Sequence, residues 1–142
     1  MSPIGGACAE KSVRWGIVGA GRIAQRFARS LAREPRSELV AISCRSAAKA
    51  VASAAAYGVG EDGTLSDEGL GSVAGSAHAA LLARPDVDAV YVALPPALHL
   101  EWSLAALRAG KAVLCEKPLC ASLEETVLLA RAARSENLLL ME

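Results

Sequence analysis

The sequence predicts an α/β fold, a single domain built on a doubly wound parallel sheet. Short apolar segments alternate with helix-like segments along most of the chain, and these apolar segments lack the polar alternation of half-exposed strands. Strands that are apolar on both sides occur in parallel sheets that helices cover on both faces. A length of 142 residues also suits one domain of ordinary size.

The first half of the chain predicts two strand–helix pairs. In chain order, the expected elements are a strand at 13–18, a helix at 22–33, a strand at 38–44 and a helix at 46–57. Ser46 stands at the expected N-cap of the second helix, and Gly58 follows its end. Residues 1–12 are predicted to form a loose tail, and the glycine-rich and acidic stretch 58–76 is predicted to be a long loop.

The second half repeats the alternation. In chain order, the expected elements are a helix at 77–83, a strand at 87–94, a helix at 97–109, a strand at 111–116, a helix at 122–135 and a strand at 138–141. Ser122 and Glu125 have the spacing of a capping box, and Gly110 ends the preceding helix. Parallel sheets of this kind bind ligands beyond the carboxyl ends of their strands, so candidate site residues are those that follow each strand.

The balanced charge argues against nucleic-acid and membrane partners. Lys and Arg total 15, as do Asp and Glu, so no overall field attracts a polyanion. No stretch approaches the roughly 18 apolar residues that span a membrane, and the N-terminal sequence lacks the pattern of a signal peptide. We expect a cytoplasmic protein with no nucleic-acid or membrane partner.

The cysteines predict neither a metal site nor a nucleophile. Cys8, Cys44, Cys115 and Cys120 have no metal-ligand spacing, and no histidine is near enough in sequence to complete a site. No base is placed to activate Cys115 or Cys120. We expect free thiols in a reducing compartment.

The sequence GAGRIA, residues 19–24, joins the first predicted strand to the first predicted helix. Gly19 permits a tight turn, Gly21 leaves space beside a pyrophosphate, and Ala24 lets the helix pack closely on the strand. Unpaired N–H groups at the start of the helix attract phosphate. The dinucleotide-binding residues expected in this turn are Gly19, Gly21, Arg22 and Ile23. The alternative is a pair of glycines that only forms a strand-to-helix turn. If this turn binds a dinucleotide, the predicted fold is of the Rossmann type.

The end of the second predicted strand favours NADP over NAD. An NAD site usually places Asp or Glu about 20 residues after the glycine turn, where it binds the ribose 2′-hydroxyl. Cys44 occupies that place here, and Arg45 and Ser46 follow it. The Arg45 guanidinium can pair with a 2′-phosphate, and Ser46 can donate to it from a helix N-terminus. NAD stays the alternative, with Arg45 as a solvated surface residue.

A second motif region, VDAVYVALPPALHLEWSLAALRAGKAVLCEKPL at 87–119, has a strand that ends in proline, a histidine after it, and Glu-Lys-Pro at the end of the next strand. With the glycine turn, this set resembles the N-terminal domain of the glucose-fructose oxidoreductase and inositol dehydrogenase (Gfo/Idh/MocA) family. The pattern is most similar to the branch of dimeric dihydrodiol dehydrogenase and NADP-dependent xylose dehydrogenase. The resemblance runs over 13–142 and is poor over 60–76.

The resemblance implies roles for individual residues. Lys117 would lie near the nicotinamide and help to hold the hydroxyl or carbonyl of the substrate, which makes it the candidate catalytic residue. The cofactor-binding residues that the resemblance implies are Arg45, Ser46, Leu94, Pro95, His99, Glu116 and Lys117. A cation at the end of a strand can polarise a carbonyl as hydride arrives. The alternatives are that Lys117 is an exposed lysine before a proline and that His99 packs or caps its helix. His78 is expected to be solvated.

The resemblance also implies a second domain, which carries the substrate pocket and the catalytic proton donor. We therefore expect the 142 residues, with the substrate domain absent, to bind a dinucleotide and to lack that donor. The favoured interpretation is the N-terminal part of an NADP-dependent dehydrogenase of a sugar, polyol or dihydrodiol. The alternatives are a dinucleotide-binding module or sensor without turnover, and an assembly protein. An exposed apolar face toward a missing domain would favour a homo-oligomer.

Overall fold

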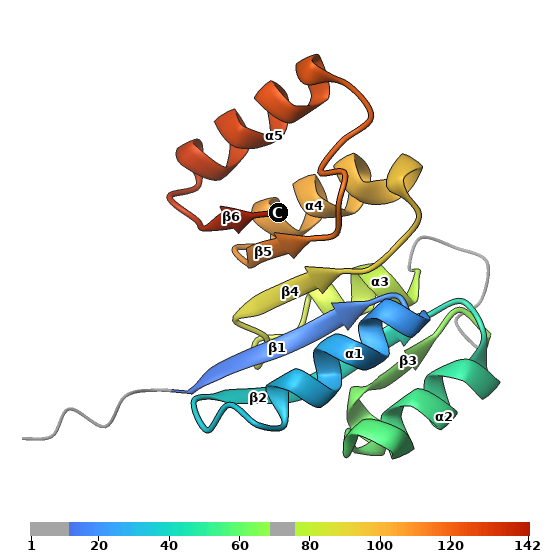
Figure 1. The fold of residues 1–142 in the computed structure, drawn as a ribbon. Helices are drawn as coiled ribbons and strands as arrows, with labels where there is room; N and C mark the ends of the chain where they lie inside the picture. The colour runs from blue at the N-terminus through green and yellow to red at the C-terminus, as the bar shows by residue number, and fades with distance from the viewer. Residues whose placement is uncertain (1–11, 69–75) are drawn as a thin grey trace, which may run out of the picture.

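The computed structural model describes residues 12–68 and 76–142, in which strands and helices alternate (Figure 1). The strands are β1 (Val13–Val18), β2 (Ser37–Cys44), β3 (Thr64–Ser66), β4 (Ala89–Val92), β5 (Ala112–Cys115) and β6 (Leu140–Met141). The helices are α1 (Arg22–Leu31), α2 (Ala47–Tyr57), α3 (Ala77–Leu82), α4 (His99–Arg108) and α5 (Leu123–Ser135), with 3₁₀ turns η1 (Glu61–Gly63) and η2 (Pro96–Leu98). The strands pair in parallel in the order β3-β2-β1-β4-β5-β6.

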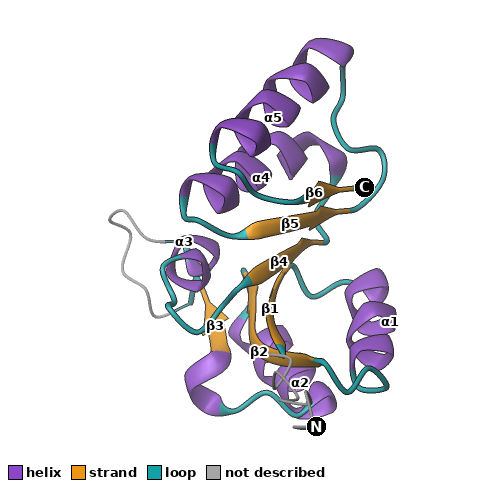
Figure 2. Ribbon diagram, turned by 90° about the vertical axis from the view of Figure 1, so that its left-hand side faces the viewer, coloured by secondary structure: helices purple, strands orange, loops and turns teal. Residues whose placement is uncertain are grey.

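Helices cover both faces of this sheet, as the sequence predicts. In Figure 2, α3, α4 and α5 lie on one side of the strands and α1 lies on the other. Neighbouring residues of the central strand β1 pack against helices on opposite faces of the sheet. Ile17 packs in a cluster with Ala24 and Ala28 of α1, whereas Val18 packs in the cluster that contains Leu107 of α4. This double burial explains why the strand is hydrophobic at consecutive positions.

The strand order reverses beside β1, which pairs with β2 on one side and with β4 on the other. From this point the chain winds outward in both directions, through β2 to β3 and through β4 to β6. Such a switch point leaves a crevice at the carboxyl ends of the two central strands, where ligands bind in open α/β sheets. The doubly wound fold is therefore confirmed.

The predicted helix starts are largely confirmed by local geometry. Ser122 accepts a hydrogen bond from the Glu125 N–H, as a capping box requires, and the Glu125 carboxylate accepts from the Ala121 N–H. Ser46 is the N-cap of α2, although its side chain makes no capping hydrogen bond. After Pro95 the chain forms the turn η2 before α4 begins.

The segment 58–76 differs from the long loop that the sequence predicts. It contains η1 and β3, and β3 pairs with β2 over three residues at the edge of the sheet. The strand was missed because it is short and lies among glycines and acids with no apolar period. The rest of the predicted loop, 69–75, and the predicted tail apart from Ser12 lie outside the described residues, as does Cys8.

Candidate functional site

The glycine turn has the geometry that the motif requires. Gly19 has φ +104, and a Cβ on it would lie 2.6 Å from the carbonyl oxygen of Ala93. Its N–H donates to the carbonyl oxygen of Ser43 at 2.8 Å, which joins the end of β1 to the end of β2. Only glycine fits both the left-handed backbone and the close approach to β4.

Open space faces the next glycine, at the N-terminus of α1. A Cβ on Gly21 would meet nothing within 4 Å, so the protein itself does not require glycine there. Gly21 is the N-cap, with no side-chain cap and no acidic residue in the first turn of the helix. Ala24 is fully buried, which brings the helix close to the sheet. The first N–H groups of α1 thus face a space that can receive an anion.

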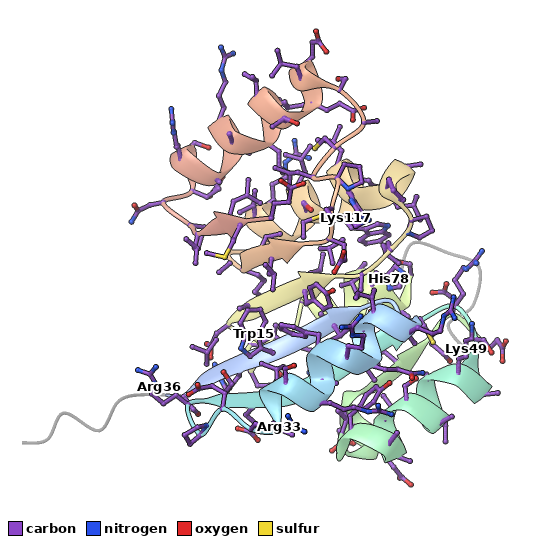
Figure 3. All side chains as sticks on the ribbon, in the orientation of Figure 1. Trp15, Arg33, Arg36, Lys49, His78 and Lys117 are labelled. Atoms are coloured by element: carbon purple, nitrogen blue, oxygen red, sulfur yellow. The ribbon has the colours of Figure 1, made fainter. Side chains whose placement is uncertain are left out.

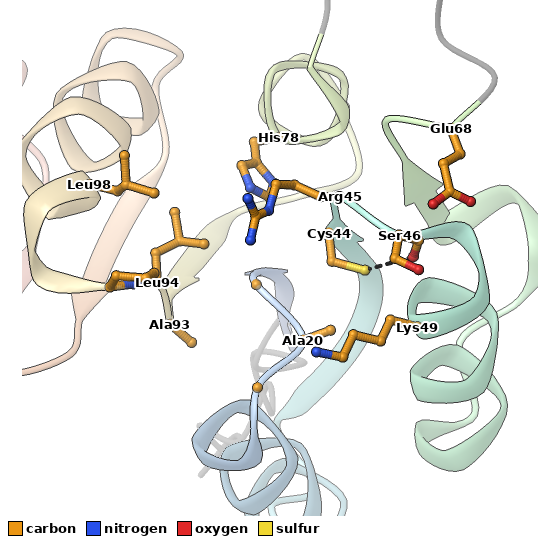
Figure 4. A pocket seen from close by; sticks show the side chains of 13 residues that line it. Ala20, Cys44, Arg45, Ser46, Lys49, Glu68, His78, Ala93, Leu94 and Leu98 are labelled. Atoms are coloured by element: carbon orange, nitrogen blue, oxygen red, sulfur yellow. Dashed lines mark hydrogen bonds between the residues drawn. The ribbon is translucent and has the colours of Figure 1, made fainter.

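A cavity of about 590 Å³ lies over this turn (Figure 4). Its lining comes from the segments that follow β1, β2 and β4, with one residue after β3 and one from α3. The lining residues are Gly19, Ala20, Gly21, Cys44, Arg45, Ser46, Lys49, Glu68, His78, Ala93, Leu94, Pro95 and Leu98. Six predicted binding residues therefore meet in one cavity, namely Gly19, Gly21, Arg45, Ser46, Leu94 and Pro95. Arg22 and Ile23 are exposed on α1 beside it.

Lys49 is a lining residue that the sequence reasoning missed. It lies in the first turn of α2, three residues after Ser46, and projects into the cavity (Figure 4). The available signal was its spacing, because a side chain three residues after an N-cap lies at the same helix end. With Arg45 it brings a second cation to the end of β2. Cys44 stands where NAD sites usually carry a carboxylate, and burial raises the pKa of its thiol.

His78 is buried, so the expectation that it is solvated is wrong. Only 6% of the residue is exposed, and its Nδ1 lies 2.8 Å from Oγ of Ser43. Its ring meets that of Trp102 edge to face, with centroids 4.9 Å apart. Burial is the main cause that lowers the pKa of His78. Sequence reasoning missed this burial because α3 has only six residues and shows no clear polar face.

A second cavity, of about 530 Å³, adjoins the end of β5. Its lining residues are Phe27, Tyr91, Leu114, Cys115, Glu116, Lys117 and Glu142. The Tyr91 hydroxyl donates to Glu116, and Lys117 is exposed beside this pair. Figure 3 shows Lys49, His78 and Lys117 near the carboxyl ends of the strands. It shows Arg33 and Arg36 near the opposite ends. The predicted catalytic lysine and the glycine turn thus lie at the same end of the strands.

His99 has no exposed surface and does not line either cavity. Its Nε2 lies 2.8 Å from the carbonyl oxygen of Leu94, and its Nδ1 lies 2.8 Å from that of Pro118. The side chain therefore joins the segments that follow β4 and β5, which matches the packing alternative. A role in cofactor binding stays a prediction and would act through these backbone segments.

In the described parts of the chain, the cysteines and the possible metal ligands show neither a nucleophile nor a metal site. Cys44, Cys115 and Cys120 are buried free thiols, and burial raises the pKa of Cys115 to about 11, which opposes a nucleophilic thiolate. Within residues 12–68 and 76–142, no group of three or more His, Cys, Asp or Glu side chains is placed to hold a metal ion. In the same ranges, no helix is long and apolar enough to cross a membrane.

Residues 13–142 match the model of the Gfo/Idh/MocA proteins, described as an oxidoreductase family with an NAD-binding Rossmann fold. The chain belongs to the Gfo/Idh/MocA family. The resemblance inferred from the glycine turn and the Glu-Lys-Pro motif is thereby confirmed. The family also confirms the Rossmann interpretation of the switch point and its crevice.

Several relatives have names that refer to reactions of sugars. The chain is 39% identical over 127 residues to 1,5-anhydro-D-fructose reductase of Ensifer adhaerens, covering 89% of this chain and 34% of the relative. It is 41% identical to dTDP-3,4-didehydro-2,6-dideoxy-alpha-D-glucose 3-reductase of Streptomyces violaceoruber, covering 93% and 35%. It is 34% identical to D-xylose 1-dehydrogenase (NADP(+)) of Hypocrea jecorina, covering 92% and 34%.

Similar solved structures agree with the fold. A 3-ketoreductase from Actinomadura kijaniata in complex with NADP has 41% identity and a TM-score of 0.79, over 93% of this chain and 38% of that one. Biliverdin reductase from Synechocystis, solved with biliverdin and NADP+, has 33% identity and a TM-score of 0.75, over 91% and 37%. The chain thus spans roughly a third of the length of the relatives it matches.

Proposed function

We propose that this chain is the dinucleotide-binding unit of an NADP-preferring oxidoreductase. The reaction would transfer hydride between the nicotinamide and a hydroxyl or carbonyl of a sugar, polyol or diol. The observation that carries the proposal is the convergence of the glycine turn, Arg45, Ser46 and Lys49 on one cavity at the switch point. The named relatives that act on sugars, and the NADP-bound structures, support the same reading.

The residues present fit a dinucleotide phosphate. Gly21 leaves the space above α1 open, and the first N–H groups of the helix can bind the pyrophosphate. Arg45 and Lys49 can neutralise a 2′-phosphate, and Ser46 can donate a hydrogen bond to it. A cavity of about 590 Å³ lies within the range of ligand pockets.

The nicotinamide, when bound, supplies or accepts the hydride, and the protein supplies position and charge. Lys117 lies at the end of β5 with its side chain exposed, where a substrate oxygen could approach it. Its ammonium would polarise a carbonyl or stabilise an alkoxide. Glu116 is held by Tyr91 and accepts from the Lys117 N–H at 3.3 Å, which fixes the backbone that carries the lysine.

The deciding experiment is a pair of fluorescence titrations of the 142-residue chain, with NADPH and with NADH. We expect tight NADPH binding and weak NADH binding. Tighter NADH binding would overturn the NADP preference and keep the fold assignment. Binding of neither cofactor would overturn the proposed function and favour the assembly alternative. Hydride transfer, the sugar, polyol or diol substrate, a cytoplasmic location, a homo-oligomer and the lack of nucleic-acid or membrane partners stay predictions.

A further inference from the structure

His78 is a buried polar side chain in the wall of the dinucleotide cavity. It projects from α3 toward the space where Arg45 also lies (Figure 4). No family motif on which the proposed function rests includes this residue, and a histidine is a costly choice for a position that is only 6% exposed. A buried imidazole is expected to have partners for both nitrogens.

Ser43 is the hydrogen-bond partner of one ring nitrogen of His78. Its backbone carbonyl accepts from the Gly19 N–H at 2.8 Å, so the residue is fixed to the phosphate-binding turn. Its hydroxyl lies 2.8 Å from Nδ1 of His78 and 3.5 Å from the carbonyl oxygen of Ile17. A hydroxyl can donate one hydrogen bond and also accept, so Oγ of Ser43 either donates to Nδ1, or donates to the Ile17 carbonyl and accepts from Nδ1. In the first arrangement, the proton of the neutral imidazole lies on Nε2, where it can be donated to a ligand.

The ring cannot turn away easily, because Trp102 packs against it at 84° between the ring planes. Among the residues that the structure describes, Nε2 of His78 has no hydrogen-bond partner, while Nδ1 is satisfied. The charged groups that act on the ring are Asp67, Arg45 and Glu101. Burial lowers the pKa of His78 more than any of them changes it, which favours a neutral ring with one N–H donor.

We propose that His78 binds the adenosine half of the dinucleotide, donating from Nε2 to an acceptor atom of the ligand, with Ser43 as the residue that sets its tautomer. This inference rests on the proposed function. The acceptor is either an oxygen of the 2′-phosphate or an acceptor of the adenosine itself, and both need the same N–H donor. His78 would thus join the glycine turn, through Ser43, to recognition of the nucleotide.

Two amide variants separate the nitrogens, because the Gln amide nitrogen can replace Nε2 and an Asn amide can replace Nδ1. We expect His78→Asn to keep a polar partner for Ser43 and to bind NADPH roughly tenfold more weakly than the wild type. We expect His78→Gln to bind within about threefold of the wild type. A loss confined to NADPH identifies the 2′-phosphate as acceptor, and an equal loss of NADH identifies the adenosine.

Wild-type affinity in both variants would overturn the inference, and so would an equal loss in both, because the effect would then come from packing against Trp102. If the wild type binds NADPH but both variants keep its affinity, or both lose affinity equally, only the His78 inference fails. If the wild type binds neither cofactor, the proposed function fails with it. Nitrogen NMR of the unliganded chain gives an independent check: the expected signal is protonated Nε2, and a protonated Nδ1 with a free Nε2 would overturn the tautomer.

Discussion

The Tyr91 hydroxyl donates to a carboxylate oxygen of Glu116 at 2.5 Å, and this bond joins β4 to the segment that carries Lys117. Burial, followed by the hydrogen bond and the charge of Glu116, raises the pKa of the Tyr91 phenol. The phenol also packs on Phe27 of α1, with ring centroids 4.2 Å apart. One side chain therefore connects the helix that follows the glycine turn with the Glu-Lys-Pro segment.

The raised pKa of Tyr91 predicts that its ionisation needs a higher pH in the native chain than in the unfolded chain. The neutral phenol is the favoured form, so its contribution to stability is complete below the ordinary tyrosine pKa of about 10 and is lost as pH rises above it. Ultraviolet titration of tyrosinate in the wild type and in Tyr91→Phe tests this. Equal titration curves for native and urea-unfolded wild type would contradict it.

Substitutions of the two motif glycines should differ in their effects on stability and on dinucleotide binding. Gly19→Ala places a Cβ 2.6 Å from the Ala93 oxygen at a left-handed φ, and we expect a loss of roughly 2–4 kcal/mol in the free energy of unfolding. A Cβ at position 21 meets no protein atom within 4 Å, so for Gly21→Val we expect a loss of about 1 kcal/mol or less, with dinucleotide binding abolished. Urea unfolding and NADPH titration of both variants check the contrast, and unchanged affinity in Gly21→Val would refute the pyrophosphate assignment.

Arg45 and Lys49 should each contribute to binding of the 2′-phosphate. We expect Arg45→Ala and Lys49→Ala to weaken NADPH binding by roughly 10- to 100-fold and to change NADH binding little, because only NADPH presents the phosphate. Arg33→Ala is the matched control, since Arg33 lies toward the opposite edge of the sheet (Figure 3). Equal losses for both cofactors would contradict the phosphate role, and an effect in the control would point to overall charge.

Replacement of the buried His99 should lower the stability of the chain. His99→Leu removes the contacts of both ring nitrogens and leaves the carbonyls of Leu94 and Pro118 without them. We expect a loss of roughly 2–4 kcal/mol in the free energy of unfolding. Because both segments border the cavities, NADPH affinity should fall as well. A urea unfolding midpoint equal to that of the wild type would show that the two contacts carry little energy.

Cys115 should react with thiol reagents only when the chain unfolds. Burial raises its pKa to about 11, so the native protein holds almost no thiolate at mildly alkaline pH, and only 2% of the residue is exposed. Labelling of native Cys115→Ser should therefore proceed at the wild-type rate. The unfolded wild type should label one thiol more than the unfolded variant. A slower native reaction in the variant would show that Cys115 is accessible.

Patterns close in sequence predicted most of the fold. Consecutive apolar residues such as Ile17 and Val18 predicted a strand buried on both faces, and each side chain indeed faces a different helix layer. The capping pair Ser122 and Glu125 was equally readable, because its contact lies within three residues, and the glycine turn was readable from the spacing of its small residues. The short edge strand β3 was not, because its pairing with β2 comes from the sheet and not from its own three residues.

The sequence by itself determined the α/β alternation, the glycine turn and the family motifs, since each depends on spacing along the chain. Only the tertiary structure decided that Lys49 and His78 join Arg45 in one cavity and that His99 is turned away from it. These facts depend on contacts between residues far apart in sequence, such as Ser43 with His78 and His99 with Pro118. Burial and hydrogen-bond partners of that kind arise only when the sheet brings the strand ends together, so no local pattern records them.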